Sequence, residues 1–389
     1  MNAIIAQCGG PSPVINASLA AAVRAWQEAG GGHIYGARYG LEGLTERNWV
    51  DLAALDARAL DTLSHQPAAA LGGSRHRPPD ADLRALPATL AAAEIGAVFL
   101  IGGNGTMAAA HTLAAAAESG ALQVLGVPKT IDNDLPGCDV TPGYGSTARY
   151  LAHTVQEIGL DLRAMRGFDQ VAVVEAMGRH TGWLAAATAL ARAEAGDPPH
   201  LILLPETPVA IDAVLERIGA VFRERRLCVV VVAEGVREAG GEYWADLAGG
   251  GSNDASGQRV FSMSAGASAW LVGQVQERLG LRCRQIKLNT AQRATRLLAS
   301  ETDRRLAALV ARAAVEAAVQ GRSGVLPALR LEGGEWRAEC VPFAAVQGRE
   351  RKLPPAYIDA ANYDVTGACR AYIAPLIGDL PPAPLLWIE

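Results

Sequence analysis

The chain has 389 residues, of which 50% are hydrophobic, so it is long enough to form two packed domains with separate cores. Its 35 basic and 40 acidic residues leave a net charge of −5, and this balance gives no reason to expect a nucleic acid or a membrane surface as partner. No apolar run reaches transmembrane length. The six scattered cysteines form neither a zinc pattern nor a disulfide framework, so we expect a reducing, cytoplasmic setting.

Short apolar runs alternate with Ala- and Leu-rich helical runs along most of the chain. The expected strands are Ala3–Gln7, Ile34–Tyr39, Ala97–Ile101, Leu122–Val127, Gln170–Glu175, Leu201–Leu204 and Cys228–Ala233. The expected helices are Val14–Ala29, Met107–Glu118, Ser146–Met165, Ala299–Gln320 and one around Gly367–Ile377, with a small strand pair between the last two. This alternation predicts an α/β protein in which helices cover parallel sheets.

Gly-rich turns stand between a strand and a helix at two places. They are Cys8-Gly9-Gly10 and Gly102-Gly103-Asn104-Gly105-Thr106. Glycines at such a turn let backbone N–H groups and the helix N-terminus approach a phosphate, although an ordinary strand-to-helix turn has the same composition. The cluster Arg75-His76-Arg77 is either a second source of charge for a polyphosphate or a solvated loop.

The loop Lys129-Thr130-Ile131-Asp132-Asn133-Asp134, called the acid loop below, comes directly after an apolar strand. Ligands of open α/β sheets bind at this end of a strand. Two carboxylates one residue apart need a cation, a proton or hydrogen-bond donors if they are buried. The acid loop therefore predicts an acid/base and metal site. The structural alternative is an Asx-rich turn with a capping role.

Polar residues also follow the strands of the second half. They are Met177-Gly178-Arg179, Pro205-Glu206 and Glu234-Gly235. A carboxylate at a strand end suits sugar hydroxyls, but it can also cap the next helix. The segment Arg282–Arg293 carries four cations and is either a phosphate grip or a basic, solvated edge strand.

These motifs together resemble the phosphofructokinase family in order, spacing and strand-end placement over nearly the whole chain. They are Gly9-Gly10, Gly102–Thr106, Pro128–Asp134, Met177–Trp183, Pro205-Glu206 and Gln292-Arg293. The segments 6–18 and 368–377 further resemble the bacterial pyrophosphate-dependent branch. The resemblance implies two three-layer α/β/α, Rossmann-like domains with mostly parallel sheets and an active site in the cleft between them. It divides the chain into a donor-binding part (1–145, to which C-terminal segments return), a sugar-phosphate-binding part (146–320) and a strand pair with a closing helix (321–389).

The resemblance also implies the chemistry, which is phosphoryl transfer to O1 of fructose 6-phosphate with Mg²⁺ as cofactor. Asp132 would be the general base, while Lys129 and Arg179 would stabilise the transferring group. Metal contacts are implied for Asn104, Asp132 and Asp134. Substrate contacts are implied for Thr130, Asp134, Met177, Gly178, Glu206, Arg284 and Arg293, and donor contacts for Gly10, Arg75, Gly103, Asn104, Gly105 and Thr106. A neighbouring subunit would complete the site in a homodimer or homotetramer.

The chain departs from the family pattern at four positions. Asn104 and Gly105 lack the carboxylate that relatives carry at one or the other position, and Gln170 and Thr290 replace stronger ligands of the 6-phosphate. The donor stays open: Lys129 and the opening and tail segments favour pyrophosphate, whereas Gly105 favours ATP.

Two other functions compete with this interpretation. The acid loop disfavours a nucleotide-cofactor kinase of the NAD-kinase type, which shares the Gly-Gly-x-Gly-Thr turn. The intact base and its neighbouring cations disfavour an inactive regulatory or sugar-phosphate-binding paralogue.

Overall fold

A computed structural model of the chain describes residues 1–74, 76–117, 122–165, 167–249, 251–253, 259–261 and 265–380. These residues form two compact units. Unit 1 comprises Met1–Thr147 and Arg293–Arg351, and unit 2 comprises Ala148–Gln292 together with the segment from Lys352 onward. No helix of the described residues combines the length and the apolar character that crossing a membrane requires.

Unit 1 is built on a seven-stranded sheet. Its strands are β1 (Asn2–Gln7), β2 (Ile34–Ala37), β3 (Trp49–Asp51), β4 (Ile95–Gly102), β5 (Gln123–Pro128), β12 (Val325–Glu332) and β13 (Glu335–Pro342). Their order is β13-β12-β5-β4-β1-β2-β3, and only the two edge strands pair antiparallel to their neighbours. The central strands bury nearly every side chain, as expected where helices cover both faces of a parallel sheet.

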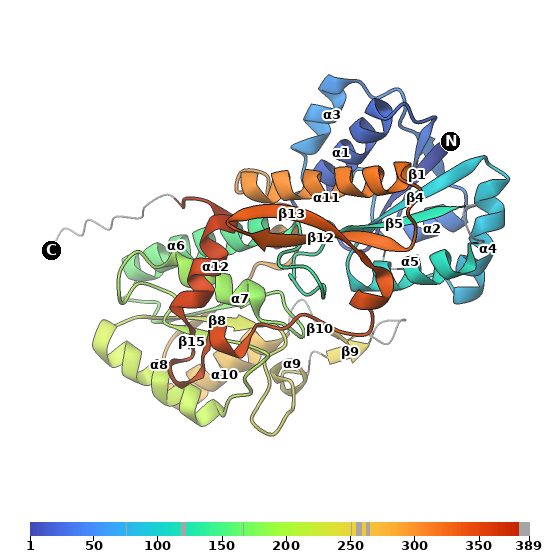
Figure 1. The fold of residues 1–389 in the computed structure, drawn as a ribbon. Coiled ribbons are helices and arrows are strands. Elements are labelled where there is room, and N and C mark those ends of the chain that lie inside the picture. Colours follow the sequence, from blue (N-terminus) through green and yellow to red (C-terminus); the bar gives the residue numbers. More distant parts are fainter. Residues whose placement is uncertain are drawn as a thin grey trace. The chain divides into compact units, whose positions relative to one another are not determined.

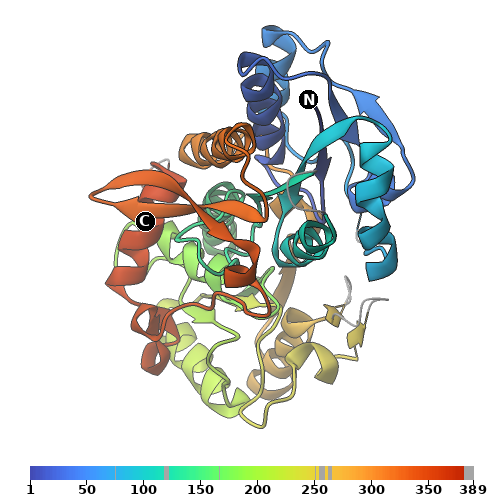
Figure 2. The same cartoon turned by 45° about the vertical axis from the view of Figure 1, so that its right-hand side comes forward.

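Helices cover both faces of this sheet. The helices of unit 1 are α1 (Ile15–Glu28), α2 (Leu41–Thr45), α3 (Ala57–Ser64), α4 (Asp80–Ala91), α5 (Asn104–Ala116) and α11 (Glu301–Val319). Helix α11 lies beside α1 (Figure 1). In the turned view, α1 and α11 are on one side of the strands and α4 is on the other (Figure 2). Unit 1 is therefore a three-layer α/β/α unit.

Unit 2 is built on a smaller, wholly parallel sheet. Its strands are β6 (Val171–Ala176), β7 (Leu201–Leu203), β8 (Cys228–Ala233) and β11 (Cys283–Lys287), in the order β11-β6-β8-β7. The chain enters this unit within α6 (Tyr144–Ala164). The other helices are α7 (Trp183–Ala187), α8 (Ile211–Arg225), α9 (Trp244–Leu247), α10 (Ala267–Leu279) and α12 (Gly367–Ile377).

Two short antiparallel strand pairs stand outside the main sheets. They are β9 (Gly251–Asn253) with β10 (Arg259–Phe261), and β14 (Ile358–Asp359) with β15 (Asp364–Val365). The two main sheets confirm the α/β class and the mostly parallel pairing expected from the sequence.

The two compact units do not coincide with the three ranges expected from the sequence, although a return of C-terminal segments to the first range was expected. The first unit ends at Thr147, close to the expected 145, but 293–351 belongs to unit 1 rather than to the middle or the tail. The reason is tertiary pairing, because α11 packs on α1 and β12 pairs with β5.

Candidate active site

Three neighbouring parallel strands of unit 1 end at the same edge of its sheet. The strands β1, β4 and β5 lie side by side, so the loops that follow them converge. These loops are Cys8–Gly10, the Gly-rich turn at Gly103 and the acid loop. The carboxyl edge of such a sheet is where α/β proteins bind their ligands.

Lys129 joins the three loops through hydrogen bonds. Its Nζ donates to the carbonyl oxygens of Cys8 at 3.0 Å and Gly10 at 2.7 Å. Its backbone N–H donates to the carbonyl of Gly102 at 3.0 Å. Burial, helped by the charge of Arg293, lowers the pKa of Lys129 to about 8, so the amine is still mostly protonated at neutral pH.

Arg293 adds a second cation beside the first glycine loop. A Cβ placed on Gly10 would lie 3.0 Å from its Nη1, so Gly10 leaves room for this guanidinium. Arg293 therefore lies in unit 1 near the donor-side loops.

Asn104 and Asp134 connect the Gly-rich turn to the acid loop. The Nδ2 of Asn104 donates to Oδ2 of Asp134 at 2.9 Å. Burial raises the pKa of Asp134 to about 7, and the charges of Asp132 and Glu350 add to this shift. The Oδ1 atoms of Asn104 and Asp134 are buried without a hydrogen-bond partner. These two orphaned oxygens, with the nearby Asp132 carboxylate, form a set of hard oxygen ligands that suits a divalent cation.

The described residues contain no cluster of three or more His, Cys, Asp or Glu side chains that could hold a metal ion by themselves. The amide of Asn104 is therefore an important member of the set, since it supplies the third oxygen-bearing side chain.

The Gly-rich turn leads into α5, whose N-terminus is open to an anion. A Cβ on Gly103 would lie 3.4 Å from the carbonyl oxygen of Lys129, which is an ordinary contact. Gly105 is exposed and has no atom within 4 Å of a Cβ position, so a side chain fits there. Thr106 is buried and packs against Gly102. Arg75 lies outside the described residues.

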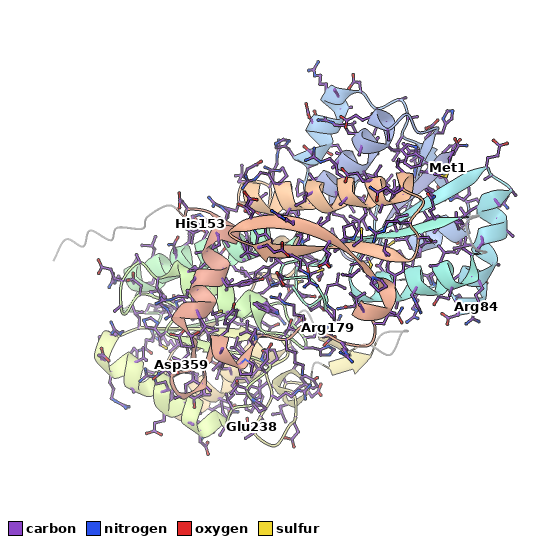
Figure 3. The ribbon with its side chains drawn as sticks, in the orientation of Figure 1. Met1, Arg84, His153, Arg179, Glu238 and Asp359 are labelled. Carbon is purple, nitrogen blue, oxygen red and sulfur yellow. The ribbon has the colours of Figure 1, made fainter. Side chains whose placement is uncertain are left out.

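In unit 2, the loops after the adjacent strands β6 and β8 lie against each other. Gly178 has φ +133, and its N–H lies 3.4 Å from Oε1 of Glu234. Gly235 donates its N–H to the carbonyl of Gly178 at 3.2 Å, and a Cβ at position 235 would overlap the backbone of Arg179. These loops therefore place Met177, Gly178, Arg179 and Glu234 together (Figure 3 labels Arg179).

Glu206 is held in its loop through one carboxylate oxygen, while its Oε2 is buried without a hydrogen-bond partner, so its expected sugar contact stays a prediction. Its Oε1 accepts the N–H groups of Gly182 at 2.9 Å and Leu353 at 3.0 Å. Burial raises the pKa of Glu206, and these two hydrogen bonds oppose the shift. The sequence places Glu234 at the end of a strand without assigning it to the site. The parallel register of β6 and β8, which pairs Ala176 with Ala233, is the signal that would have placed it beside Met177.

The cations of β11 already have partners within unit 2. Arg284 pairs with Asp169 at 2.5 Å, although its side chain is 53% exposed. Lys287 pairs with Glu175 at 2.7 Å, and Glu175 is buried while the Lys287 side chain is 11% exposed. Because Arg284 belongs to unit 2 and Arg293 to unit 1, a joint grip of these two arginines on one phosphate stays a prediction.

Gln170 contributes its side chain to the edge of the same sheet. Its Oε1 accepts the backbone N–H of Arg282 at 2.8 Å. The guanidinium of Arg282 lies over the ring of Phe168, 4.4 Å from its centre. Thr290 is exposed.

Comparisons with known proteins give consistent matches. The family model described as phosphofructokinase matches residues 2–318. A pyrophosphate--fructose 6-phosphate 1-phosphotransferase of Halomonas elongata is 35% identical, covering 98% of this chain and 93% of the relative. A sulfofructose kinase of Alkalicoccus urumqiensis is 33% identical, covering 98% and 97%. The crystal structure of a pyrophosphate-dependent phosphofructokinase from Nitrosospira multiformis aligns with a TM-score of 0.86 and 32% identity, covering 98% of this chain and 94% of that one.

Proposed function

Because the chain belongs to the phosphofructokinase family, we propose that it transfers a phosphoryl group from pyrophosphate to O1 of fructose 6-phosphate, giving fructose 1,6-bisphosphate. The observation that carries this proposal is the acid loop after β5, where Asp132 and Asp134 follow the buried Lys129, which hydrogen-bonds to the loops after the adjacent strands β1 and β4. The Halomonas relative, which carries the name of this activity, supports the choice of donor and acceptor.

The donor side is formed by unit 1. Lys129 and Arg293 place positive charge beside the first glycine loop, and the N-terminus of α5 adds the positive end of a helix dipole. Pyrophosphate is small and highly charged, so it is held by such fixed charges without an aromatic or apolar surface. Donor contacts of Gly10, Gly103 and Thr106 are proposed on the family resemblance, with Gly103 at the N-terminus of α5.

Asp132 is the general base. As O1 of the sugar attacks phosphorus, the O1–H bond breaks and its proton passes to the Asp132 carboxylate, while the bond from phosphorus to the bridging oxygen breaks and phosphate leaves. Lys129 and Arg179 neutralise negative charge on the transferring group and the leaving phosphate. Positioning and fixed positive charge supply most of the rate enhancement in this reaction class.

A divalent cation fits the acid loop, and Mg²⁺ is the ion we propose. The orphaned Oδ1 atoms of Asn104 and Asp134 would hold it together with the Asp132 carboxylate. When bound, the ion neutralises charge on the phosphate oxygens. Asn104 and Asp134 keep their oxygens in place through the hydrogen bond between them.

The sugar side includes the turn after β6. Met177 and Gly178 line it, and Glu234 supplies the carboxylate that lies against this turn. Glu206 also holds the backbone at Gly182 and Leu353 by accepting their N–H groups. Thr130 and Arg284 complete the proposed sugar contacts. Arg293, which lies beside Gly10, is proposed as a further contact of the sugar phosphate on the family resemblance.

The replacement of Asp132 by Asn tests the base. The amide keeps the shape but cannot accept the proton, so kcat should fall by about 10² or more while KM for fructose 6-phosphate changes little. The matched control is Asp139→Asn, which alters a nearby carboxylate that accepts from the N–H of Leu331 and should leave kcat unchanged. Retention of more than about a tenth of the wild-type kcat by the Asp132 variant would contradict the role.

A sugar sulfonate is the second candidate acceptor. It is favoured by the pairing of Arg284 with Asp169 and by Gln170 and Thr290, which leave little uncommitted positive charge for a 6-phosphate. A sulfonate carries a single negative charge and needs fewer cations. The sulfofructose kinase of Alkalicoccus urumqiensis also covers 98% of this chain.

A direct comparison decides between the acceptors. The kcat/KM for fructose 6-phosphate and for 6-deoxy-6-sulfofructose should be measured with pyrophosphate and then with ATP. We expect the phosphate sugar with pyrophosphate to give the largest value. A larger value for the sulfonate would change the acceptor and leave the donor chemistry intact.

The cellular location and the oligomeric state are also proposals. All six cysteines are free thiols, which fits a reducing cytoplasm. We propose a homodimer or homotetramer on the family resemblance.

A further inference from the structure

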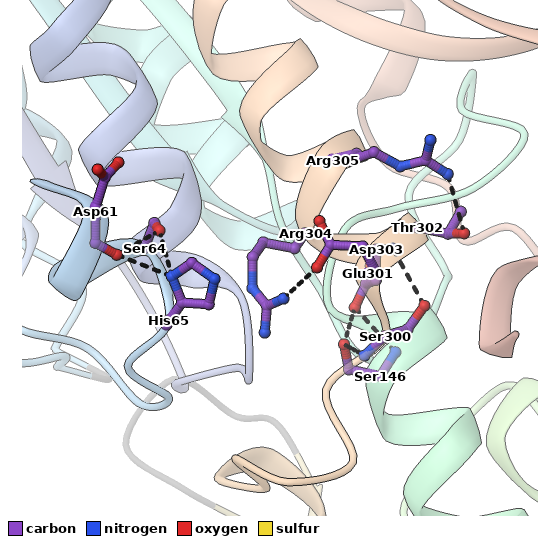
Figure 4. A network of polar contacts seen from close by, with 10 residues as sticks. All are labelled: Asp61, Ser64, His65, Ser146, Ser300, Glu301, Thr302, Asp303, Arg304 and Arg305. Carbon is purple, nitrogen blue, oxygen red and sulfur yellow. Dashed lines mark hydrogen bonds and ion pairs between the residues drawn. The ribbon is translucent and has the colours of Figure 1, made fainter.

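Asp303 is a buried carboxylate of α11 that the reaction described above does not use. Its side chain is only 1% exposed. Its Oδ1 accepts the N–H of Gly143 at 2.9 Å, and its Oδ2 accepts the N–H and the hydroxyl of Ser146 at 2.9 and 2.6 Å. Figure 4 shows the contacts with Ser146. Both carboxylate oxygens are thus committed to the segment that begins α6.

The network requires an ionised carboxylate at this position. The three groups that contact the Asp303 carboxylate are all hydrogen-bond donors: the N–H of Gly143, and the N–H and hydroxyl of Ser146. The hydroxyl of Ser146 accepts the N–H of Ser300 at 3.0 Å, so its own hydrogen points to Asp303 (Figure 4). A protonated acid or an amide in place of the carboxylate would set a donor against a donor.

The segment 141–146, which Asp303 holds, contacts the acid loop near both ends of that loop. At one end, Thr130 donates its N–H to the carbonyl of Pro142 at 3.2 Å and forms a parallel bridge with Gly143. At the other end, Thr141 donates its N–H to Oδ1 of Asn133 at 3.0 Å. Asp132 lies between these two contacts in the sequence.

Gly143 packs tightly against the acid loop in a backbone conformation that strains any side chain. Gly143 has φ +110, and a Cβ there would lie 3.3 Å from the carbonyl oxygen of Thr130. Asn133 is fully buried with φ +53, a conformation that its hydrogen bond to Thr141 stabilises. A shift of the segment 141–146 is therefore passed directly to the backbone that carries Asp132.

We propose that Asp303 is a positioning residue for the acid loop. Its carboxylate fixes the segment 141–146, and that segment sets the place of Asp132 without any contact between Asp303 and the substrates. This inference rests on the proposed function, since it assumes that Asp132 is the base.

A purely structural role makes a different prediction. Negative charge at the first turn of α6 stabilises a helix N-terminus, so loss of Asp303 would lower the melting temperature and leave kcat per folded molecule unchanged. A positioning role changes kcat in molecules that remain folded.

The test is Asp303→Asn in the full chain. We expect kcat to fall by about 10- to 100-fold, because small misplacement of a reacting group costs rate in this range, while KM for fructose 6-phosphate stays within about threefold. Circular dichroism at the assay temperature should show a folded protein. Hydrogen exchange should rise at 130–134 and 141–146. The matched control is Asp56→Asn, which removes the capping carboxylate of α3 from the N–H of Ala59 and should leave kcat unchanged.

A folded Asp303 variant with wild-type kcat would overturn the inference, as would a loss of activity that matches the loss of folded protein. If this variant does not fold, Ser146→Ala decides, because it deletes the hydroxyl that donates to Asp303 and accepts from Ser300 but keeps both backbone donors to the carboxylate. A lower kcat with unchanged KM supports positioning, and a wild-type kcat overturns it. The Asp132→Asn variant distinguishes a failure of the proposed function from a failure of the positioning role. If Asp132→Asn remains active, the proposed base is wrong, whereas an inactive Asp132 variant with an unaffected Asp303 variant removes only the positioning role.

Discussion

At the scale of single residues, His200 gives the fold a specific dependence on pH. Burial lowers its pKa to about 4, and the charges of Arg225 and Arg192 add to the effect. Its Nδ1 accepts the N–H of Val229 at 2.9 Å, so the folded chain holds the neutral ring. In the unfolded chain the pKa returns to about 6.5. The unfolded state therefore binds more protons between these two values.

We predict that the free energy of unfolding falls as pH is lowered from about 6.5 to 4, by on the order of 3 kcal/mol from this group. The contribution is fully present above the unfolded pKa. His200→Asn removes the titrating ring, so the free energy of unfolding should depend less on pH. Because Oδ1 of the asparagine can still accept from Val229, the stability near pH 7.5 should largely be kept. Urea unfolding of both proteins at several pH values measures this, with His76→Asn as an exposed control. An equal dependence of the free energy of unfolding on pH in wild type and variant would contradict the prediction.

Residue identity alone predicted part of the site. The spacing of Asp132 and Asp134 after an apolar run indicated the acid loop, because few structural roles need two carboxylates there. The environments of Glu206 and Glu234 depend on which loops meet across β6, β7 and β8. Local sequence does not show which loops contact each other. Both carboxylates follow a strand, and only the register of the strands distinguishes their environments.

At the scale of elements, we predict that the N-terminus of α5 selects the donor. Gly105 is exposed in its first turn, and no atom lies within 4 Å of a Cβ position. An aspartate fits there without a clash, and negative charge in the first turn of a helix is tolerated or slightly stabilising.

We predict that Gly105→Asp suppresses any ATP-supported rate and spares or improves the pyrophosphate-supported rate, because its carboxylate would repel the α-phosphate of a nucleotide. The kcat/KM of both donors should be measured for this variant and for Gly105→Ala, which adds the Cβ without the charge. Equal effects on the two donors would exclude donor selection by charge. A wild-type kcat/KM larger with MgATP than with magnesium pyrophosphate would reverse the donor assignment.

Gln170 directly precedes β6, and we predict that this position affects acceptor binding. Gln170 holds the backbone of Arg282 through its Oε1. We predict that Gln170→Arg lowers KM for fructose 6-phosphate with little change in kcat, since it adds uniform binding of the 6-phosphate. Gln170→Leu removes the hydrogen bond without adding charge and is the control. An unchanged or higher KM in the arginine variant would mean that other cations already fill this role.

The elements themselves were predicted best where an uninterrupted apolar run or a cap marks their ends. The strand Cys228–Ala233 and the helix Gly367–Ile377 have the expected bounds, and Thr366 caps that helix through the N–H of Cys369. The strand expected at Ile34–Tyr39 ends at Ala37, because Tyr39 has φ +61. Helix α5 begins at Asn104 rather than Met107, and its expected end at Glu118 lies outside the described residues.

At the scale of the whole molecule, the chain builds each unit from segments far apart in sequence. The segment from Arg293, with α11 and the β12–β13 hairpin, returns to unit 1. Arg293 and Asp303 of α11 thereby reach loops formed by the first half of the chain. A pattern of strands and helices does not encode this return. It follows from the pairing of β12 with β5 and from the apolar face that α11 shares with α1.

The family resemblance implies that a second subunit completes the site, and unit 2 has a surface that suits an interface. Phe168 is 55% exposed and Met165 is 42% exposed, and both belong to one turn because Phe168 donates its N–H to the carbonyl of Met165. Arg282 stacks on the Phe168 ring beside Gln170. Exposed apolar and aromatic side chains with an arginine are typical of interface centres.

We predict that sedimentation velocity shows at least a dimer for the wild type and that Phe168→Lys shifts it toward the monomer and lowers activity. The lysine would remove apolar area and add a charge beside Arg282, and charge at the centre of an interface opposes association. The matched control is Val319→Lys, at a position of unit 1 that is 59% exposed, where a cation at the C-terminal end of α11 is well accommodated. A fully active wild-type monomer would remove the need for a second subunit. An unchanged sedimentation coefficient for the Phe168 variant would place the interface elsewhere on the chain.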